Sequence, residues 1–348
     1  MNNFVNYLNT MNNMGGNAVS TLAEAQVTSE YFKKIQVKRD ITKIIVDRIR
    51  NKEYDTIILT GHAGDGKTSI LVQVLAELGM LKDQQPLEEA THYDKDGLSL
   101  FAVKDMSELS ENKQIEYCRE ALTSYKKGIA SIIISNTGPL IKCIQDVYKN
   151  DCKERGEYFN QSKLGNLQNE VLDRLDRSTL EPLEIGLYKA IIINIARIDN
   201  VGFVKNIIPK LIKKELWQAC GSCAKCDKCP IFNNVKMLRR FETRVMDFIT
   251  AYFRYMYEND KRMTIRQMLS QISYALTGNL TCNKVQIVRE EENKFKYFFA
   301  NLFFGYKGLE KVRAASQITG IRNISNLKID SISLRACLKS CKILHKCV

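Results

Sequence analysis

The chain has 348 residues, of which 45% are apolar and five are proline, and this composition predicts a folded, soluble protein with a substantial core in one or two domains. No apolar run reaches the ~18–20 residues that a membrane span needs, so we expect no membrane partner. Eleven cysteines and an N-terminus without the basic and apolar regions of a secretory signal predict a reducing, cytoplasmic location.

Positive charge is concentrated in the second part of the chain. The formal net charge is +13, but residues 201–348 hold 27 Lys and Arg against 11 Asp and Glu, whereas residues 1–200 hold 25 against 28. Phosphate backbones are the commonest partner of a strongly basic surface, so we expect DNA as a partner. A surface that only aids solubility is the alternative. Aromatic residues alternate with basic ones at 252–255, where they could stack on bases or face a core.

The first two predicted elements precede any recognisable motif. Residues 1–29 are rich in asparagine, which predicts a flexible or loosely docked segment. Apolar residues recur at helical spacing from Tyr31 to Ile49, and they predict one amphipathic helix. We therefore expect the first domain to begin near residue 30.

A glycine-rich sequence then follows a short apolar run. The run at 57–59 predicts a buried strand, and residues 61–68 read G-H-A-G-D-G-K-T, which matches the phosphate-loop (P-loop, Walker A) pattern G-x-x-x-x-G-K-S/T. Glycines let backbone N–H groups turn toward phosphate oxygens, which a Cβ would obstruct. Helical spacing over residues 69–79 predicts a helix whose N-terminus faces the bound anion. The sequence thus predicts an ATP site, with a glycine turn that binds no nucleotide as the alternative.

Each residue of this loop has an expected role. Lys67 can reach the β- and γ-phosphates, and the Thr68 hydroxyl can ligate Mg²⁺. We expect the other residues to line the nucleotide: Gly61, His62, Ala63, Gly64, Asp65, Gly66 and Ser69.

Three more apolar runs predict the rest of a sheet. They lie at 98–103, 129–134 and 190–195, whereas the polar residues 82–98 predict a loop. Predicted helices lie between the runs, at 110–127 and 161–177. Continuous apolar strands that alternate with helices are typical of a parallel sheet covered on both faces. We therefore predict an α/β fold of the P-loop NTPase type, AAA+-like, over residues 30–200.

Polar residues that follow two of these strands are candidates for catalysis. Hydrolysis requires a carboxylate that holds Mg²⁺ or polarises water, and polar groups around the γ-phosphate. Asp105 and Glu108 follow the second strand, and Asp105 is the candidate Mg²⁺ ligand, with a helix N-cap as the alternative. Asn136 follows the third strand, where a γ-phosphate sensor would lie, with a turn residue as the alternative.

Three arginines are candidates for a charge contact with the nucleotide. Arg174 and Arg177 lie on the helix predicted at 161–177, and either could reach a neighbouring copy if the chain forms a ring. Arg266 lies on a helix predicted to begin after Thr264, from which it could contact the nucleotide as part of a lid. A homo-oligomer is therefore an expected assembly, and ordinary surface charges are the alternative.

Four cysteines at equal spacing predict a metal site. Cys220, Cys223, Cys226 and Cys229 form the pattern C-x₂-C-x₂-C-x₂-C, and disulfides are rare in a reducing compartment. Four thiolates bind Zn²⁺ or an iron–sulfur (4Fe-4S) cluster, and the spacing is compatible with either. We expect a structural clip in a mainly helical, basic second domain over residues 201–348. A looser set of possible ligands lies near the C-terminus: Cys337, Cys341, His345 and Cys347.

Short motifs spread over residues 30–305 carry a resemblance to a known family. They are Val37-Lys38-Arg39-Asp40-Ile41, Gly64-Asp65-Gly66-Lys67, Lys104-Asp105-Met106-Ser107-Glu108, and Cys229-Pro230-Ile231 with Asn233. With these motifs the chain resembles the ATPase component, called the F protein, of bacterial DNA phosphorothioation-dependent restriction systems. The resemblance implies a role in antiviral defence, in which the chain works with other subunits of a complex to restrict DNA that lacks the sulfur modification. A neighbouring P-loop defence ATPase family is the alternative.

These observations favour one function and leave two others open. We expect an ATP-binding and ATP-hydrolysing switch or motor subunit that engages DNA through its basic second domain. A nucleotide-dependent scaffold without hydrolysis is the first alternative, because the acidic motif around Asp105 is a poor match to a catalytic one. A P-loop kinase for a small molecule is the second.

Overall fold

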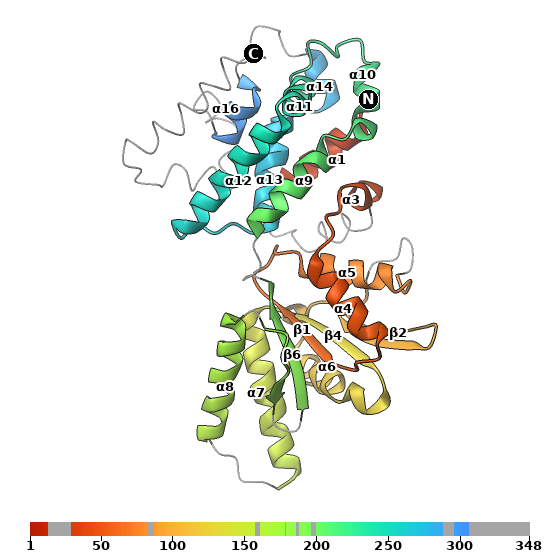
Figure 1. Cartoon of the computed structure of the whole chain (residues 1–348), viewed down its shortest axis with the longest axis vertical. Coiled ribbons are helices and arrows are strands. Elements are labelled where there is room, and N and C mark those ends of the chain that lie inside the picture. The colour runs from red at the N-terminus through yellow and green to blue at the C-terminus, as the bar shows by residue number, and fades with distance from the viewer. Residues whose placement is uncertain are drawn as a thin grey trace. The chain divides into compact units, whose positions relative to one another are not determined.

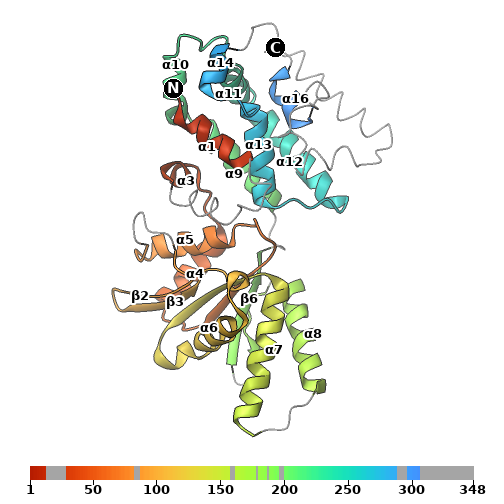
Figure 2. The same ribbon diagram turned by 180° about the vertical axis from the view of Figure 1, so that it is seen from behind.

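The computed structural model describes residues 1–12, 29–81, 87–156, 161–177, 179–185, 188–195, 200–287 and 296–305. The chain consists of two compact units, here called the sheet unit, Glu24–Asn200, and the helical unit, Met1–Ala23 with Val201–Val348 (Figures 1 and 2). The looser cysteine and histidine set near the C-terminus lies outside the described residues. Within the described ranges, every helix is too short or too polar to cross a membrane.

The sheet unit is a mixed α/β structure with a six-stranded, mostly parallel sheet. The strands are β1 (Thr56–Thr60), β2 (Ala90–Lys95), β3 (Leu98–Val103), β4 (Ala130–Ser135), β5 (Leu183–Ile185) and β6 (Tyr188–Asn194). Their order is β2-β3-β4-β1-β6-β5. The four central strands are parallel, and β2 and β5 pair antiparallel at the two edges. The predicted α/β class and the four predicted strands are confirmed.

Helices cover both faces of this sheet. The helices of the sheet unit are α3 (Glu30–Ile35), α4 (Asp40–Arg50), α5 (Lys67–Glu77), α6 (Glu111–Thr123), α7 (Thr137–Glu154) and α8 (Gln161–Asp176), with short 3₁₀ helices η1 (Met106–Glu108) and η2 (Ser124–Lys127). One face packs Ile57 and Ile132 against α4 and α5, and the other packs Ile58 and Ile133 against α6, α7 and α8. Because both faces are buried, the central strands are apolar at consecutive positions rather than alternating ones.

The helix predicted from Tyr31 to Ile49 is two helices. Residues 36–39 are extended between α3 and α4, and the buried Gln73 side chain of α5 binds this stretch. Its Oε1 accepts from Arg39 N at 3.2 Å, and its Nε2 donates to Val37 O at 3.0 Å. Hydrogen bonds to a residue far along the chain thus replace the helical ones, which is why local spacing did not reveal the break.

The loop predicted at 82–98 contains a strand. Residues 90–95 form β2, which pairs antiparallel with β3 through a turn at Asp96 and Gly97, whose φ angles are 50° and 74°. Positive φ at both central residues is the requirement of a two-residue type I′ hairpin turn, and Asp-Gly meets it readily. The polar side chains of β2 belong to an edge strand, and residues 82–86 lie outside the described part.

The helical unit is built from packed helices. They are α1 (Asn3–Asn12), α9 (Asn200–Leu211), α10 (Gln218–Gly221), α11 (Pro230–Arg240), α12 (Glu242–Glu258), α13 (Ile265–Thr277), α14 (Cys282–Ile287) and α16 (Phe299–Phe303), with a 3₁₀ helix η4 (Lys214–Trp217). Thr264 caps α13 in a reciprocal box with Gln267, which confirms the predicted start of that helix.

The prediction of a flexible N-terminal segment does not hold for residues 3–12. These residues form α1, which packs along α13 (Figure 1). Phe4 and Leu8 of this helix are completely buried. The Phe4 ring meets the Trp217 ring edge-on at 5.5 Å, and Asn9 Nδ2 donates to Leu280 O at 2.8 Å. The asparagines suggested mobility, but the apolar residues between them form one helix face. Residues 13–28 lie outside the described part.

Candidate functional site

A glycine loop joins the central strand β1 to helix α5. Thr60, the last residue of β1, is level with Ser135 of β4 and Asn194 of β6, so the loop leaves the carboxyl edge of the sheet. Gly64 and Gly66 have φ angles of 92° and 87°, in the left-handed region that favours glycine. Gly66 is the N-cap of α5, which begins at Lys67. The glycine spacing is therefore required by the path of the backbone.

The Lys67 side chain lies inside this loop. It is 6% exposed, and its Nζ donates to Gly61 O at 3.0 Å, to His62 O at 3.1 Å and to Asn136 Oδ1 at 3.0 Å. The first two acceptors belong to the loop, and the third follows the neighbouring strand β4. Two residues that the sequence placed in one site, Lys67 and Asn136, are thus in direct contact.

The hydrogen-bonded array continues from Asn136 to the end of β3. Asn136 N donates to Ser107 Oγ at 3.0 Å, and Ser107 N donates to Asp105 Oδ1 at 2.9 Å. Since β4 lies between β1 and β3, the segments that follow all three strands meet at one edge. In the sequence Ser107 was quoted only as part of a motif, although an aspartate side chain that bonds the backbone N–H two residues later is a known turn pattern.

Asp105 has a structural role, and Glu108 is exposed. The Asp105 carboxylate caps η1 through Ser107 N, which confirms the N-cap interpretation. Glu108 is exposed at the end of η1. Binding of Mg²⁺ by Asp105 and catalysis by Glu108 stay predictions.

One residue of the loop, Asp65, has a buried carboxylate, and its charge acts on the guanidinium group of Arg39. Asp65 is fully buried, and its Oδ2 accepts from His62 N at 3.1 Å. Burial lowers the pKa of Arg39, while the charges of Asp65 and then Asp40 oppose that shift. The Arg39 Nη2 atom is buried and makes no hydrogen bond within the described residues. From the sequence, Arg39 was noted only as part of a short motif. Its position near Asp65 depends on the break between α3 and α4, which local spacing did not reveal.

Four other residues of the loop and of the first turn of α5 are less buried than Lys67. His62 and Ala63 are exposed, and Thr68 and Ser69 are half-buried in the first turn of α5. These four side chains therefore lie outside the fully buried core of the sheet unit.

Two of the candidate arginines lie at the same sheet edge as the loop. Asn194, at the end of β6, donates from Nδ2 to Leu175 O at 2.7 Å, which holds the last turn of α8 there. Arg174 pairs with Glu181 at 3.3 Å, and Arg177 pairs with Asp173 at 2.9 Å. Both guanidinium groups thus have partners within their own unit, and contact with another copy of the chain stays a prediction.

The third candidate arginine belongs to the helical unit. Arg266 lies in the first turn of α13, half-buried, and burial lowers its pKa. Its contact with a nucleotide in the sheet unit stays a prediction.

The four equally spaced cysteines occupy a short turn region of the helical unit. Cys223 N donates to Cys220 O at 3.3 Å, Cys226 N donates to Cys223 O at 2.9 Å, and Cys229 is the N-cap of α11. Among the described residues, no three His, Cys, Asp or Glu side chains stand in a geometry that would already hold a metal ion. The metal therefore stays a prediction.

A fifth cysteine lies close to this turn region. This cysteine is Cys282. Burial raises the pKa of Cys229, and the charges of Cys220 and Cys282 raise it further. Hydrogen bonds from the N–H groups of Phe232 and Ile231 lower the same pKa. Burial also raises the pKa of Cys220, where a hydrogen bond from Asn2 opposes it. Sequence reasoning missed Cys282, because it lies on α14 and no local spacing relates it to the other four.

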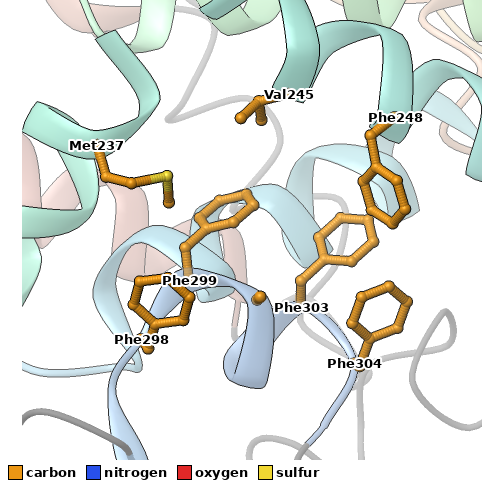
Figure 3. A pocket seen from close by; sticks show the side chains of 8 residues that line it. Met237, Val245, Phe248, Phe298, Phe299, Phe303 and Phe304 are labelled. Carbon is orange, nitrogen blue, oxygen red and sulfur yellow. The ribbon is translucent and has the colours of Figure 1, made fainter. Parts of the chain in front are cut away.

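Aromatic residues of the helical unit mostly pack against one another. Tyr252 and Phe253 are buried, and only Tyr255 of that motif presents a large exposed ring. Figure 3 shows a small pocket beside them, lined by Met237, Val245, Phe248, Phe298, Phe299, Ala300, Phe303 and Phe304. Because this lining is wholly apolar, the pocket offers no side chain to a phosphate or a base edge.

Comparison of the chain with models of known protein families, with curated proteins and with solved structures gave no match. The fold and the site therefore define the class of the sheet unit as a mixed α/β structure with a mostly parallel sheet.

Proposed function

We propose that residues 61–69 are a P-loop that binds ATP with Mg²⁺, and that the chain is an ATP-hydrolysing switch or motor subunit of a DNA-directed bacterial defence complex. The observation that carries the proposal is the position of the Lys67 amine. It lies buried in a glycine loop after a central parallel strand, at a helix N-terminus, and in contact with Asn136, which follows the neighbouring strand β4.

The contacts of Lys67 are compatible with a phosphate loop. A buried ammonium group is costly without hydrogen bonds, and the two loop carbonyls and the Asn136 amide supply them. A phosphate oxygen would be a stronger, charge-assisted partner for the same amine. Backbone N–H groups of the loop and of the first turn of α5 would add further donors. Thr68, in that turn, would ligate Mg²⁺.

Hydrolysis would use the array that links β3 and β4. Asn136 would contact the γ-phosphate, since it already bonds to Lys67. Asp105 uses Oδ1 to cap η1, which leaves Oδ2 for Mg²⁺ or for a water molecule. Glu108 would complete the acidic motif. Arg174 and Arg177, at the same edge of the sheet, would act across a contact between copies of the chain in a homo-oligomer.

A specific observation favours a scaffold as the second candidate. The structure gives Asp105 a capping role and leaves Glu108 in solvent, so neither carboxylate is committed to the loop. A chain of this kind would bind ATP and hold partner subunits together in one nucleotide state. Release of inorganic phosphate that DNA stimulates would support the motor or switch. Tight ATP binding without turnover would support the scaffold, and transfer of phosphate to a nucleoside or metabolite would support a kinase.

The helical unit is proposed to face DNA. Its exposed cations include Lys205, Lys213, Lys214, Lys236, Arg240, Arg244, Arg254 and Lys284. The cysteines at 220–229 are proposed to bind Zn²⁺ or a 4Fe-4S cluster as a structural clip of this unit. The other subunits of the complex would be its protein partners in the cytoplasm.

Replacing Arg39 with alanine is expected to raise the Kd for ATP about tenfold. The guanidinium charge offsets the buried Asp65 carboxylate beside the loop, and a lost charge interaction of about 1–2 kcal/mol corresponds to roughly that factor. Arg39→Lys keeps the charge and should retain most of the affinity. Titration of a fluorescent ATP analogue measures both. The double variant Arg39→Ala, Asp65→Asn should bind ATP as the wild type does. A Kd for ATP that rises as much in Arg39→Lys as in Arg39→Ala would contradict the role of the charge.

DNA binding is expected to depend steeply on salt. In a plot of the logarithm of the DNA association constant against the logarithm of salt concentration, each neutralised phosphate contributes about −0.9 to the slope. The loss of several cations should therefore make this slope less steep. The triple variant Arg240→Ala, Arg244→Ala, Arg254→Ala should bind duplex DNA at least about tenfold more weakly at moderate salt. Fluorescence anisotropy over a salt series measures both quantities. Alanine at the exposed Lys126 and Lys127 of the sheet unit is the control, and an equal loss there would contradict a DNA-facing helical unit.

A further inference from the structure

We propose that Cys220, Cys223, Cys229 and Cys282 are the four ligands of a thiolate metal centre, and that Cys226 is not a ligand. This inference rests on the proposed metal binding by the cysteines at 220–229 and changes its ligand set. The centre would tie three parts of the helical unit together: the N-terminal residues that lead into α1, the turn between α10 and α11, and α14.

The Asn2 residue brings Cys220 and Cys282 together. Asn2 Nδ2 lies 3.3 Å from Cys220 Sγ, and Asn2 O lies 4.0 Å from Cys282 Sγ. Asn2 is itself buried and fixed, because Nδ2 also donates to Leu216 O at 2.9 Å and Oδ1 accepts from Phe4 N at 2.9 Å. Two cysteines that are far apart in the sequence therefore touch the same anchored residue.

Further contacts hold α14 against the cysteine turn. Lys225, within the turn, donates from Nζ to Gln286 O of α14 at 2.8 Å. Cys229 lies close enough to Cys220 and Cys282 for their charges to interact, and Cys220 interacts in the same way with Cys282 and Cys223. These pairings connect four thiols, one of which comes from α14.

Cys226 stands apart from this group. Its backbone N–H bonds to Cys223 O at 2.9 Å, but within the described residues its thiol makes no hydrogen bond and no charge interaction with the other four. Equal spacing suggested four equivalent ligands, whereas the fold leaves the third one out and supplies a replacement from α14.

Hydrogen bonds and a cation act on Cys229 and Cys220 against the effect of burial, which raises the pKa of both thiols. The N–H groups of Ile231 and Phe232, in the first turn of α11, donate to the Cys229 sulfur. The charge of Arg239 interacts with that of Cys220. Arg239 Nε donates to Ile212 O at 2.7 Å, whereas its Nη2 is buried and makes no hydrogen bond among the described residues. Hydrogen bonds and cations around the sulfurs are typical of thiolate centres, because four thiolates around a divalent metal carry a net negative charge.

Metal binding would draw these thiols closer. A Zn–S bond of about 2.3 Å in tetrahedral geometry places the sulfurs roughly 3.8 Å apart, so the turn and α14 would close around the metal. For a divalent ion, four thiols would lose four protons to solvent, and four metal–sulfur bonds would form. The ligand set is shared by zinc and by an iron–sulfur cluster, and the metal content separates the two.

The test compares five single cysteine-to-serine variants of the full chain. Zinc, iron and acid-labile sulfide are measured per protein chain after purification. We expect Cys226→Ser to retain the wild-type content, and serine at 220, 223, 229 or 282 to lose most of it. Loss with Cys226→Ser and retention with Cys282→Ser would overturn the ligand assignment but leave metal binding standing. Wild-type protein without zinc or iron would instead contradict the metal proposal itself.

A second measurement uses only the wild-type chain, so it does not depend on how the variants fold. The metal-loaded protein is treated with iodoacetamide, and labelled cysteines are located by mass spectrometry before and after chelation. Cys226 should be labelled in the loaded protein, and Cys282 only after the metal has been removed. Protection of Cys226 together with labelling of Cys282 in the loaded protein would overturn the assignment.

Discussion

Replacing Lys67 with alanine should raise the Kd for ATP at least about 100-fold and reduce phosphate release to background. The amine is expected to make charge-assisted bonds to the β- and γ-phosphates, each worth about 1.5–3 kcal/mol, and two such bonds correspond to that factor. Isothermal titration with ATP and Mg²⁺ measures binding, and a phosphate-release assay with and without DNA measures turnover. Loss of binding and turnover together would support the phosphate loop.

The matched control for this variant is Lys38→Ala. Lys38 lies near the start of α4, its side chain is 85% exposed, and it forms only a surface ion pair with Glu77 at 3.3 Å. Such pairs contribute little, so its affinity for ATP should equal that of the wild type. Because Lys67 is itself hydrogen-bonded within the loop, the thermal unfolding of both variants is compared first. A folded Lys67→Ala protein that binds ATP normally would refute the proposed site.

Replacing Asn234 with alanine should lower the free energy of unfolding by roughly 3–5 kcal/mol. Asn234 is 3% exposed on α11, and its Nδ2 lies 2.9–3.3 Å from the carbonyls of Ala275, Leu276 and Tyr297. Its Oδ1 accepts from Phe299 N at 2.9 Å. Two of these carbonyls belong to the last turn of α13, where no intrahelical partner exists. Alanine would leave four buried polar groups with fewer partners.

The neighbouring residue provides a control on the same helix. Asn233 is exposed, and its side chain makes one hydrogen bond, to Asp227 O at 3.1 Å. Asn233→Ala should therefore change stability by less than about 1 kcal/mol. Urea denaturation of both variants measures the difference, and similar midpoints for the two would contradict the role assigned to Asn234.

The predicted strands proved reliable because their apolar runs reflect burial on both faces. β1, β4 and β6 carry consecutive isoleucines, and no surface strand would tolerate such a run. The two strands that were not predicted, β2 and β5, lie at the edges of the sheet, where polar residues are allowed. Asp96-Gly97 was nevertheless a readable hairpin signal between residues 90 and 103.

The candidate site was predictable only in part. The phosphate-loop motif and the polar residue after the next strand, Asn136, follow from local sequence and from the rule that parallel strands end at one edge. Arg39 and Cys282 do not, because each is brought to its neighbours by contacts with residues far along the chain. Hydrogen bonds with Gln73 hold the extended stretch that carries Arg39. Asn2 contacts both Cys220 and Cys282.

The sequence by itself determined the α/β class, the four central strands and the glycine loop with Lys67, because burial and left-handed backbone turns restrict residue type locally. Only the tertiary structure decided that residues 3–12 form a helix of the helical unit and that the first predicted helix is broken. These features depend on partners that lie far away in the chain. Their hydrogen bonds and buried surfaces exist only after folding.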